Sequence, residues 1–210
     1  MRHMKVAIFG ATGTIGRQVV ARALAAGHEV TVLTRNAANL TVKDKRLRVE
    51  VGDVLDPAAV ERTVIGQDAV IITLGAGRKG VVRAEGTRRI IEAMERTGVK
   101  RLICQSSLGV GDSRGNLNFV WKYLMFGMLL RQAYADHVVQ EQYVQASDLD
   151  WTIVRPSAFT DGPATGTYRR GFPATEPGLS LKISRADIAN FLVEQLTDDT
   201  YLRRTPGISN

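Results

Sequence analysis

Short apolar runs alternate with amphipathic, helix-like stretches along most of the chain. The runs are rich in Val and Ile and carry few polar residues, which is typical of parallel strands that are buried on both faces. We predict strands over residues 6–9, 30–33, 47–51, 69–72, 102–104 and 151–154.

Between these strands the apolar positions follow a helical period, and residues typical of helix ends mark the boundaries. Gly27 closes the first stretch, whereas Asp56 and Pro57 open the second as an N-cap and a first helical residue. We predict helices over residues 15–26, 57–65, 85–97 and 138–146. The alternation predicts a single α/β domain over residues 1–210, a Rossmann-type doubly wound parallel sheet with its ligand cleft at the carboxyl ends of the strands.

The pattern changes after the last predicted strand. Residues 157–181 are rich in Gly, Pro and Thr, and the sequence from Ser184 to Asp187 then resembles a capping box that opens a helix over residues 188–196. Long irregular loops in α/β domains usually shape a site, so we expect residues 157–210 to form the substrate-side wall. The alternative is that this segment is a surface loop without a role in ligand binding.

Composition narrows the class of protein. A chain of 210 residues, 44% of them hydrophobic, can bury a core without help from a disulfide or a metal. Cys104 is the single cysteine, so no internal disulfide can form, which suits a reducing compartment. The three histidines lack zinc-ligand spacing, and we expect no metal site.

The net charge of +7 is compatible with a nucleic-acid partner or an anionic small molecule. The basic residues are scattered in short pairs, which indicates a solvated basic surface and no nucleic-acid partner. The apolar stretch 119–130 contains Lys122 and is too short to span a membrane, and too few residues precede the first strand for a signal peptide. We expect a cytoplasmic monomer or weak homodimer without a membrane partner.

Three glycines, each three residues from the next, connect the first strand to the first helix. Gly10 permits a tight turn, Gly13 permits close approach of a pyrophosphate, and Gly16 permits close packing of helix on sheet. The helix N-terminus then presents free N–H groups and a favourable dipole to phosphates. A plain strand–helix turn is the alternative. The expected cofactor-binding residues of this turn are Gly10, Thr12, Gly13, Thr14, Ile15, Gly16 and Arg17.

The second strand indicates which dinucleotide binds. NAD-preferring sites usually place a carboxylate at the end of this strand, where it binds the ribose hydroxyls. Here Arg35 occupies that place, and its guanidinium suits the 2′-phosphate of NADP(H). Arg17 could assist. The alternative is that Arg35 is a surface arginine without a partner.

With these residues in place, the chain resembles the atypical short-chain dehydrogenase/reductase group that includes flavin reductase/biliverdin-IXβ reductase and NmrA-like proteins. The resemblance covers nearly the whole chain. It rests on the segments 8–13, 29–35, 52–55, 66–70, 151–156 and 183–188.

The resemblance implies a place along the cofactor for further residues. It implies that Asp53 and Val54 contact the adenine side and that Ser106 and Ser107 face the nicotinamide. The remaining implied residues are Leu74, Gly75, Ala76 and Arg78 along the middle of the cofactor, and Pro156, Ser157, Ala158 and Phe159 on the floor of the hydride-transfer site. Purely structural roles, such as a turn cap for Asp53, remain the alternative.

The tyrosines limit the chemistry. No tyrosine is followed four residues later by lysine, so the proton donor of ordinary alcohol dehydrogenases is missing. An acceptor whose hydride adduct is a stabilised anion, such as a flavin or a quinone, needs only positioning, exclusion of water and a polar group such as Ser107. We therefore predict an NADPH-dependent reductase that uses flavin as a substrate, with an NmrA-like NADP(H) sensor as the alternative.

Three further residues or segments qualify this prediction. His137 is a candidate proton relay or phosphate contact, or else a surface residue. Ala158 stands where members that reduce biliverdin often have a histidine, which makes a tetrapyrrole a weaker expectation than a flavin. The stretch 119–130 is expected to cover the acceptor site as a lid, or to pack into the core.

Overall fold

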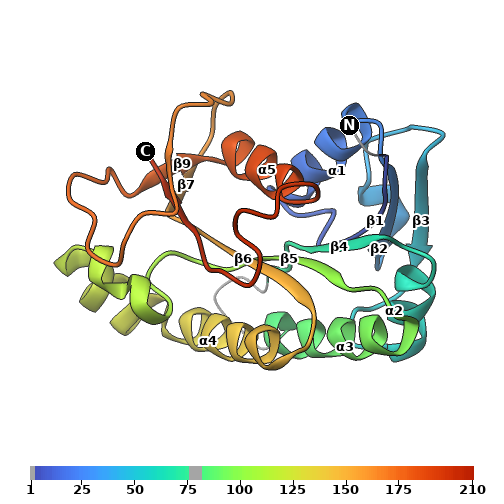
Figure 1. Cartoon of the computed structure of the whole chain (residues 1–210), viewed down its shortest axis with the longest axis horizontal. Coiled ribbons are helices and arrows are strands. Elements are labelled where there is room, and N and C mark those ends of the chain that lie inside the picture. Colours follow the sequence, from blue (N-terminus) through green and yellow to red (C-terminus); the bar gives the residue numbers. More distant parts are fainter. Residues whose placement is uncertain (1–2, 76–81) are drawn as a thin grey trace.

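The computed structural model describes residues 3–75 and 82–210, and it contains an eight-stranded, mostly parallel sheet between two layers of helices (Figure 1). The strand order is β3-β2-β1-β4-β5-β6-β10-β8, and only β8 runs antiparallel to its neighbour. The strands are β1 (Lys5–Phe9), β2 (Glu29–Thr34), β3 (Leu47–Val51), β4 (Ala69–Ile72), β5 (Arg101–Gln105), β6 (Asp150–Pro156), β8 (Arg169–Arg170) and β10 (Gly207–Ser209). This arrangement confirms the predicted doubly wound fold.

Helices cover both faces of the sheet. α1 (Gly16–Ala25) and α5 (Arg185–Glu194) pack together on one face, and Figure 1 shows them above the sheet in blue and red. The other face carries α2 (Pro57–Val64), α3 (Val82–Thr97) and α4 (Arg131–Ala146). The sheet is therefore buried on both sides.

Alternate residues of β1 show why its sequence is apolar from Val6 to Phe9. Val6 and Ile8 belong to the core under α1 and α5, whereas Ala7 and Phe9 belong to the core over α2, α3 and α4. Because successive side chains of a strand point to opposite faces, a strand covered on both sides needs apolar residues at every position. The continuous runs in the sequence reflect this burial.

Three helices begin earlier than the sequence predicts. α3 begins at Val82, α4 at Arg131 and α5 at Arg185, each before the residue expected from the sequence. The error is largest for α4, because its first two turns lack a clean apolar stripe and bury the charged residue Asp136. The predicted capping box is confirmed, since the Ser184 side chain accepts a hydrogen bond from the Asp187 N–H.

The sequence also missed four very short strands. β8, β10 and a small parallel pair, β7 (Ala158–Thr160) with β9 (Lys182–Ser184), contain only two or three residues each. Such segments are too short to show an alternating pattern. β10 pairs with the open edge of β6 and β8 then pairs with β10, whereas β7 and β9 form a separate two-stranded sheet. They hold the C-terminal segment against the rest of the sheet.

The apolar stretch after β5 forms η4 (Val120–Leu129), a π-helical segment that leads directly into α4. Trp121 and Phe126 pack against a small core of Leu108, Leu117 and Leu181. In the part of the chain that the structure describes, no helix combines the length and apolar character needed to span a membrane.

Asp187 fixes the loop between β7 and β8. Its carboxylate is fully buried and accepts hydrogen bonds from the Thr165 N–H at 2.9 Å, the Gly166 N–H at 2.9 Å and the Ser184 hydroxyl at 2.7 Å. Burial alone would raise the pKa of Asp187, but these hydrogen bonds outweigh it and hold that pKa below its usual range.

We expect Asp187→Asn to lower the free energy of unfolding by about 1–3 kcal/mol near neutral pH, because an amide cannot accept all these bonds. A folded-state pKa below the unfolded value of about 3.9 gives stability that is present above that value and is lost as pH falls through the folded pKa. The difference between wild type and variant should therefore shrink in urea unfolding as pH falls below about 4. A difference that is constant with pH would contradict this role.

Candidate functional site

A cavity of about 750 Å³ lies at the carboxyl ends of the central strands, where the sequence placed the ligand cleft. Its walls come from the ends of β1, β2 and β5, the turns after β1, β2, β3 and β4, the first two residues of α3, and one residue each from α4 and β7. The lining residues are Phe9, Gly10, Thr12, Gly13, Thr14, Ile15, Leu33, Thr34, Arg35, Asn36, Asn39, Gly52, Asp53, Val54, Leu55, Thr73, Leu74, Gly75, Val82, Arg83, Gln105, His137 and Phe159.

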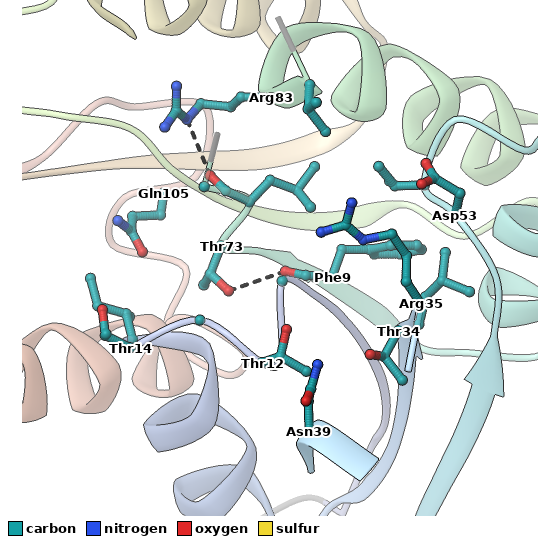
Figure 2. A pocket seen from close by; sticks show the side chains of 18 of the residues that line it. Phe9, Thr12, Thr14, Thr34, Arg35, Asn39, Asp53, Thr73, Arg83 and Gln105 are labelled. Carbon is teal, nitrogen blue, oxygen red and sulfur yellow. Dashed lines mark hydrogen bonds between the residues drawn. The ribbon is translucent and has the colours of Figure 1, made fainter. Parts of the chain in front are cut away.

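The glycine turn between β1 and α1 is packed too tightly for side chains at two positions. Gly10 has a φ of +88°, and a Cβ there would lie 2.5 Å from the Thr73 carbonyl oxygen. A Cβ on Gly16 would lie 2.1 Å from the Gly10 carbonyl oxygen. Figure 2 shows Thr73 beside this turn, where its hydroxyl donates to the Phe9 carbonyl at 3.1 Å. The turn is thus fixed by backbone contact with the end of β4.

The same turn suits an anion. α1 begins without a side-chain cap and without an acidic residue in its first turn. Thr12, Gly13 and Thr14 line the cavity directly in front of it. Uncapped N–H groups and the positive end of the helix dipole together favour a phosphate at this position. The residues present therefore fit a dinucleotide pyrophosphate.

Arg35 lies at one end of this cavity, near Asp53, whereas Thr14 and Gln105 lie toward the other (Figure 2). The Arg35 side chain is exposed and makes no ion pair with any residue that the structure describes. Asp53 lines the cavity and also accepts the Leu55 N–H at 2.9 Å, so its turn-capping role is real and leaves the second oxygen available.

Not every predicted cofactor residue lies in the wall. Leu74 and Gly75 line the cavity, but Ala76 and Arg78 fall outside the described residues. Gly16 acts through packing, and Arg17 lies on the exposed side of α1, outside the lining. The position of Arg17 gives no support to a role beside Arg35.

Arg83 is a cavity residue that the sequence did not reveal. Its guanidinium donates to the Leu74 carbonyl at 3.1 Å, as Figure 2 shows, and to the Asp136 carboxylate at 3.0 Å. Asp136 also accepts the Ala84 N–H at 3.0 Å. The pair therefore ties α3, α4 and the end of β4 together at the edge of the cavity, and no local sequence pattern announces such a contact.

A second cavity, of about 350 Å³, adjoins the first. It is mostly apolar and lies between η4, α4 and the segment after β6. Its lining residues are Ser107, Leu108, Leu117, Trp121, Phe126, Leu130, Ala133, Tyr134, His137, Pro156, Ser157, Ala158, Phe159, Leu181 and Arg185. His137 and Phe159 line both cavities, so the two spaces meet at these side chains.

His137 is held in one protonation state at this junction. Burial and the nearby Arg83 charge lower the pKa of His137 to about 3, so the ring is neutral at physiological pH. Its Nδ1 lies 3.3 Å from Oε1 of Gln140, an acceptor, and Gln140 in turn donates to the Thr87 hydroxyl at 3.1 Å. With the Gln140 amide in this orientation, the arrangement is that of a tautomer with the proton on Nδ1 and with Nε2 as an acceptor.

Three buried polar atoms near the junction have no hydrogen-bond partner among the described residues: Gln105 Oε1, Ser106 Oγ and Ser157 Oγ. Gln105 is the last residue of β5 and lines the first cavity, Ser106 follows it and lines neither cavity, and Ser157 follows β6 and lines the second cavity. Buried polar atoms are normally satisfied, so these positions fit a ligand that donates hydrogen bonds, such as a nicotinamide carboxamide.

Arg155, in contrast, has a structural role. It is buried on β6 and forms a two-pronged pair with Glu141, at 3.0 and 2.7 Å. A third contact joins it to Asp112 at 2.5 Å. Among the described residues, no group of three or more His, Cys, Asp or Glu side chains lies close enough to hold a metal ion.

Comparison with known proteins agrees with this geometry. A family described as NAD(P)H-binding matches residues 10–199. A curated relative, UPF0659 protein YMR090W of Saccharomyces cerevisiae, is 29% identical over 93% of this chain and 88% of its own. ChuY, an anaerobillin reductase from Escherichia coli O157:H7, is 27% identical with a TM-score of 0.81 over 97% of this chain and 96% of its own. A Veillonella parvula short-chain dehydrogenase/reductase solved with NADP has a TM-score of 0.84 at 19% identity, over 100% and 95% of the two chains.

Proposed function

Because the chain belongs to the family described as NAD(P)H-binding and is similar to the anaerobillin reductase ChuY, we propose that it is an NADPH-dependent reductase of a flat conjugated acceptor. A free flavin or a quinone is the acceptor class that its residues favour. The observation that carries this proposal is the junction at His137 and Phe159, where the cavity that contains the glycine turn meets a smaller, mostly apolar one.

The first cavity would hold the cofactor along its length. Arg35 and Asp53 would hold the adenosine end, the turn of Thr12, Gly13 and Thr14 would hold the pyrophosphate, and Gln105 would hold the nicotinamide. Bound there, the cofactor supplies a hydride. The chain's contribution is to orient that group toward the second cavity and to keep water away from it.

The second cavity would take the acceptor. Trp121, Phe126 and Leu130 offer flat or flexible apolar surface, and Ser107 offers a hydroxyl near the place where negative charge develops. His137 is neutral with a free Nε2, which suits a hydrogen-bond acceptor for the N–H of a ring and argues against the phosphate contact considered from the sequence. Solvent can supply the proton to a stabilised anion after hydride transfer.

A linear tetrapyrrole is the second candidate acceptor, because ChuY, a relative of similar length, is an anaerobillin reductase. Ala158 lines the acceptor cavity here, so a histidine is absent from that position. The alternative function is that of an NADP(H) sensor with little turnover. It shares the cofactor cavity but needs no acceptor cavity.

The test is oxidation of NADPH, and separately of NADH, by the purified protein with FMN, riboflavin, a simple quinone or biliverdin, against controls without enzyme. Acceptor-dependent turnover that prefers NADPH would support the reductase. Tight binding of NADPH without turnover on any acceptor would favour the sensor.

Arg35 is the residue we expect to select NADPH. Arg35→Asp should weaken NADPH binding by about 1.5–3 kcal/mol, the scale of a hydrogen bond to a charged group, and leave NADH binding nearly unchanged. Titration calorimetry with both cofactors measures the difference. Arg17→Asp is the matched control, because Arg17 is exposed but lies outside the lining. Equal losses for NADPH and NADH in Arg35→Asp would refute the assignment.

A further inference from the structure

Arg185 is the one charged side chain among the residues that line the second cavity, as far as the structure describes them. The other lining residues are apolar, apart from hydroxyl groups and the neutral His137. A cation at the wall of an otherwise apolar cavity is costly to bury, so its presence calls for a counterpart.

The protein itself satisfies Arg185 only in part. One terminal nitrogen donates to Asp161 at 2.8 Å, but that carboxylate is 96% exposed, whereas the Arg185 side chain is only 22% exposed. Nε of Arg185 is buried and has no partner among the described residues. The Arg185 guanidinium also lies over the Phe159 ring, 5.7 Å from its centroid, which holds it against the junction of the two cavities.

The position of Arg185 in α5 adds a second argument. Arg185 is the first residue of this helix, where the positive end of the helix dipole disfavours a cation. Helix starts usually carry acidic or neutral residues. Asp187 lies in the same turn, but its carboxylate already accepts hydrogen bonds from the N–H groups of Thr165 and Gly166. A cation placed against the dipole and against burial is difficult to explain by helix stability.

We propose that Arg185 is an anion subsite of the acceptor cavity, which binds a phosphate or carboxylate arm of the acceptor while the flat ring lies beside Phe159. This inference rests on the proposed function and names its substrate class, an acceptor that carries a negative charge away from its ring. Planar guanidinium groups pair with two oxygens of such an anion, and binding would replace the exposed contact to Asp161 with a more buried one.

Two pairs of ligands distinguish the source of the anion. FMN and riboflavin share one ring and differ by the phosphate, and biliverdin and its dimethyl ester differ by the charge on two carboxylates. Binding is measured in the presence of NADP⁺, by quenching of flavin fluorescence or by the absorbance of the tetrapyrrole. No turnover occurs in this assay, so its result is separate from the outcome of the reductase test.

Arg185→Met should weaken binding of the charged member of at least one pair by about tenfold or more, the scale of a charged hydrogen bond, and change the neutral member by less than about twofold. Arg185→Lys should recover part of the loss. Lys182→Met is the matched control, because it removes one nearby charge from an exposed position outside the cavity lining. That variant should bind all four ligands as the wild type does.

The pair that responds identifies the arm, a phosphate or a carboxylate. Equal effects of Arg185→Met on the charged and neutral members, or no effect on either pair, would overturn the subsite. An equal loss in Lys182→Met would also overturn it, because long-range attraction by the basic surface would then explain the preference. Selective binding without turnover on any acceptor would leave the subsite supported and the reductase refuted.

Discussion

Asp136→Ala is expected to lower the free energy of unfolding by about 3–5 kcal/mol, the cost typical of removing one partner from a buried ion pair. The Asp136 and Arg83 side chains are only 4% and 8% exposed. Without Asp136 the Arg83 cation stays buried with one carbonyl partner, and the Ala84 N–H at the start of α3 loses its acceptor. Urea or thermal unfolding measures this loss.

The effect should extend to the cofactor cavity. Arg83 holds the Leu74 carbonyl, and both residues line that cavity, so the variant should also bind NADPH more weakly at temperatures where it remains folded. Glu61→Ala is the control, because Glu61 and its partner Arg96 are both nearly half exposed. An exposed pair contributes about 0–1 kcal/mol. A loss in Asp136→Ala no larger than that in Glu61→Ala would show that the buried pair is not stabilising.

Gly16→Ala should raise the dissociation constant for NADPH by about a hundredfold or more, or about 3 kcal/mol. The new Cβ would lie 2.1 Å from the Gly10 carbonyl oxygen, a backbone atom that also accepts the Gly13 N–H at 3.0 Å. Relief of that overlap must shift the turn whose N–H groups would face the pyrophosphate, and overpacking of this kind usually costs stability as well.

Titration calorimetry and thermal unfolding measure the two effects of Gly16→Ala. Gly127→Ala is the control, because a Cβ there would meet only the Lys122 carbonyl at an ordinary 3.5 Å, far from the cofactor turn in the sequence. Gly13→Ala provides the contrast, since its Cβ would lie 3.2 Å from the Gly10 oxygen and should disturb the fold less. Wild-type affinity in Gly16→Ala would contradict the close-packing role of that glycine.

The sequence by itself determined the sheet and the cofactor turn. β4 is apolar at every position, and β1 is apolar from Val6 onward, because both faces of the sheet are covered there, and that pattern is local enough to read from the chain. The glycine spacing after β1 is equally local, since a tight turn into a helix needs particular residues at adjacent positions. Arg35 at the end of β2 was found by the same logic, at a fixed distance from those glycines.

The tertiary structure alone decided which residues line the proposed acceptor cavity. Contacts between segments far apart in the chain explain what the sequence missed. They include the pairing of β10 with β6, the Arg83–Asp136 contact at the early start of α4, and the place of Arg185 in the second cavity. The sequence did place residues 119–130 and 157–210 near the acceptor, but it left open whether they cover a site or fill space. The local pattern of apolar and polar residues indicates which side of a helix or strand is buried. The partner that buries it is chosen by packing between distant elements, and no single segment encodes that choice.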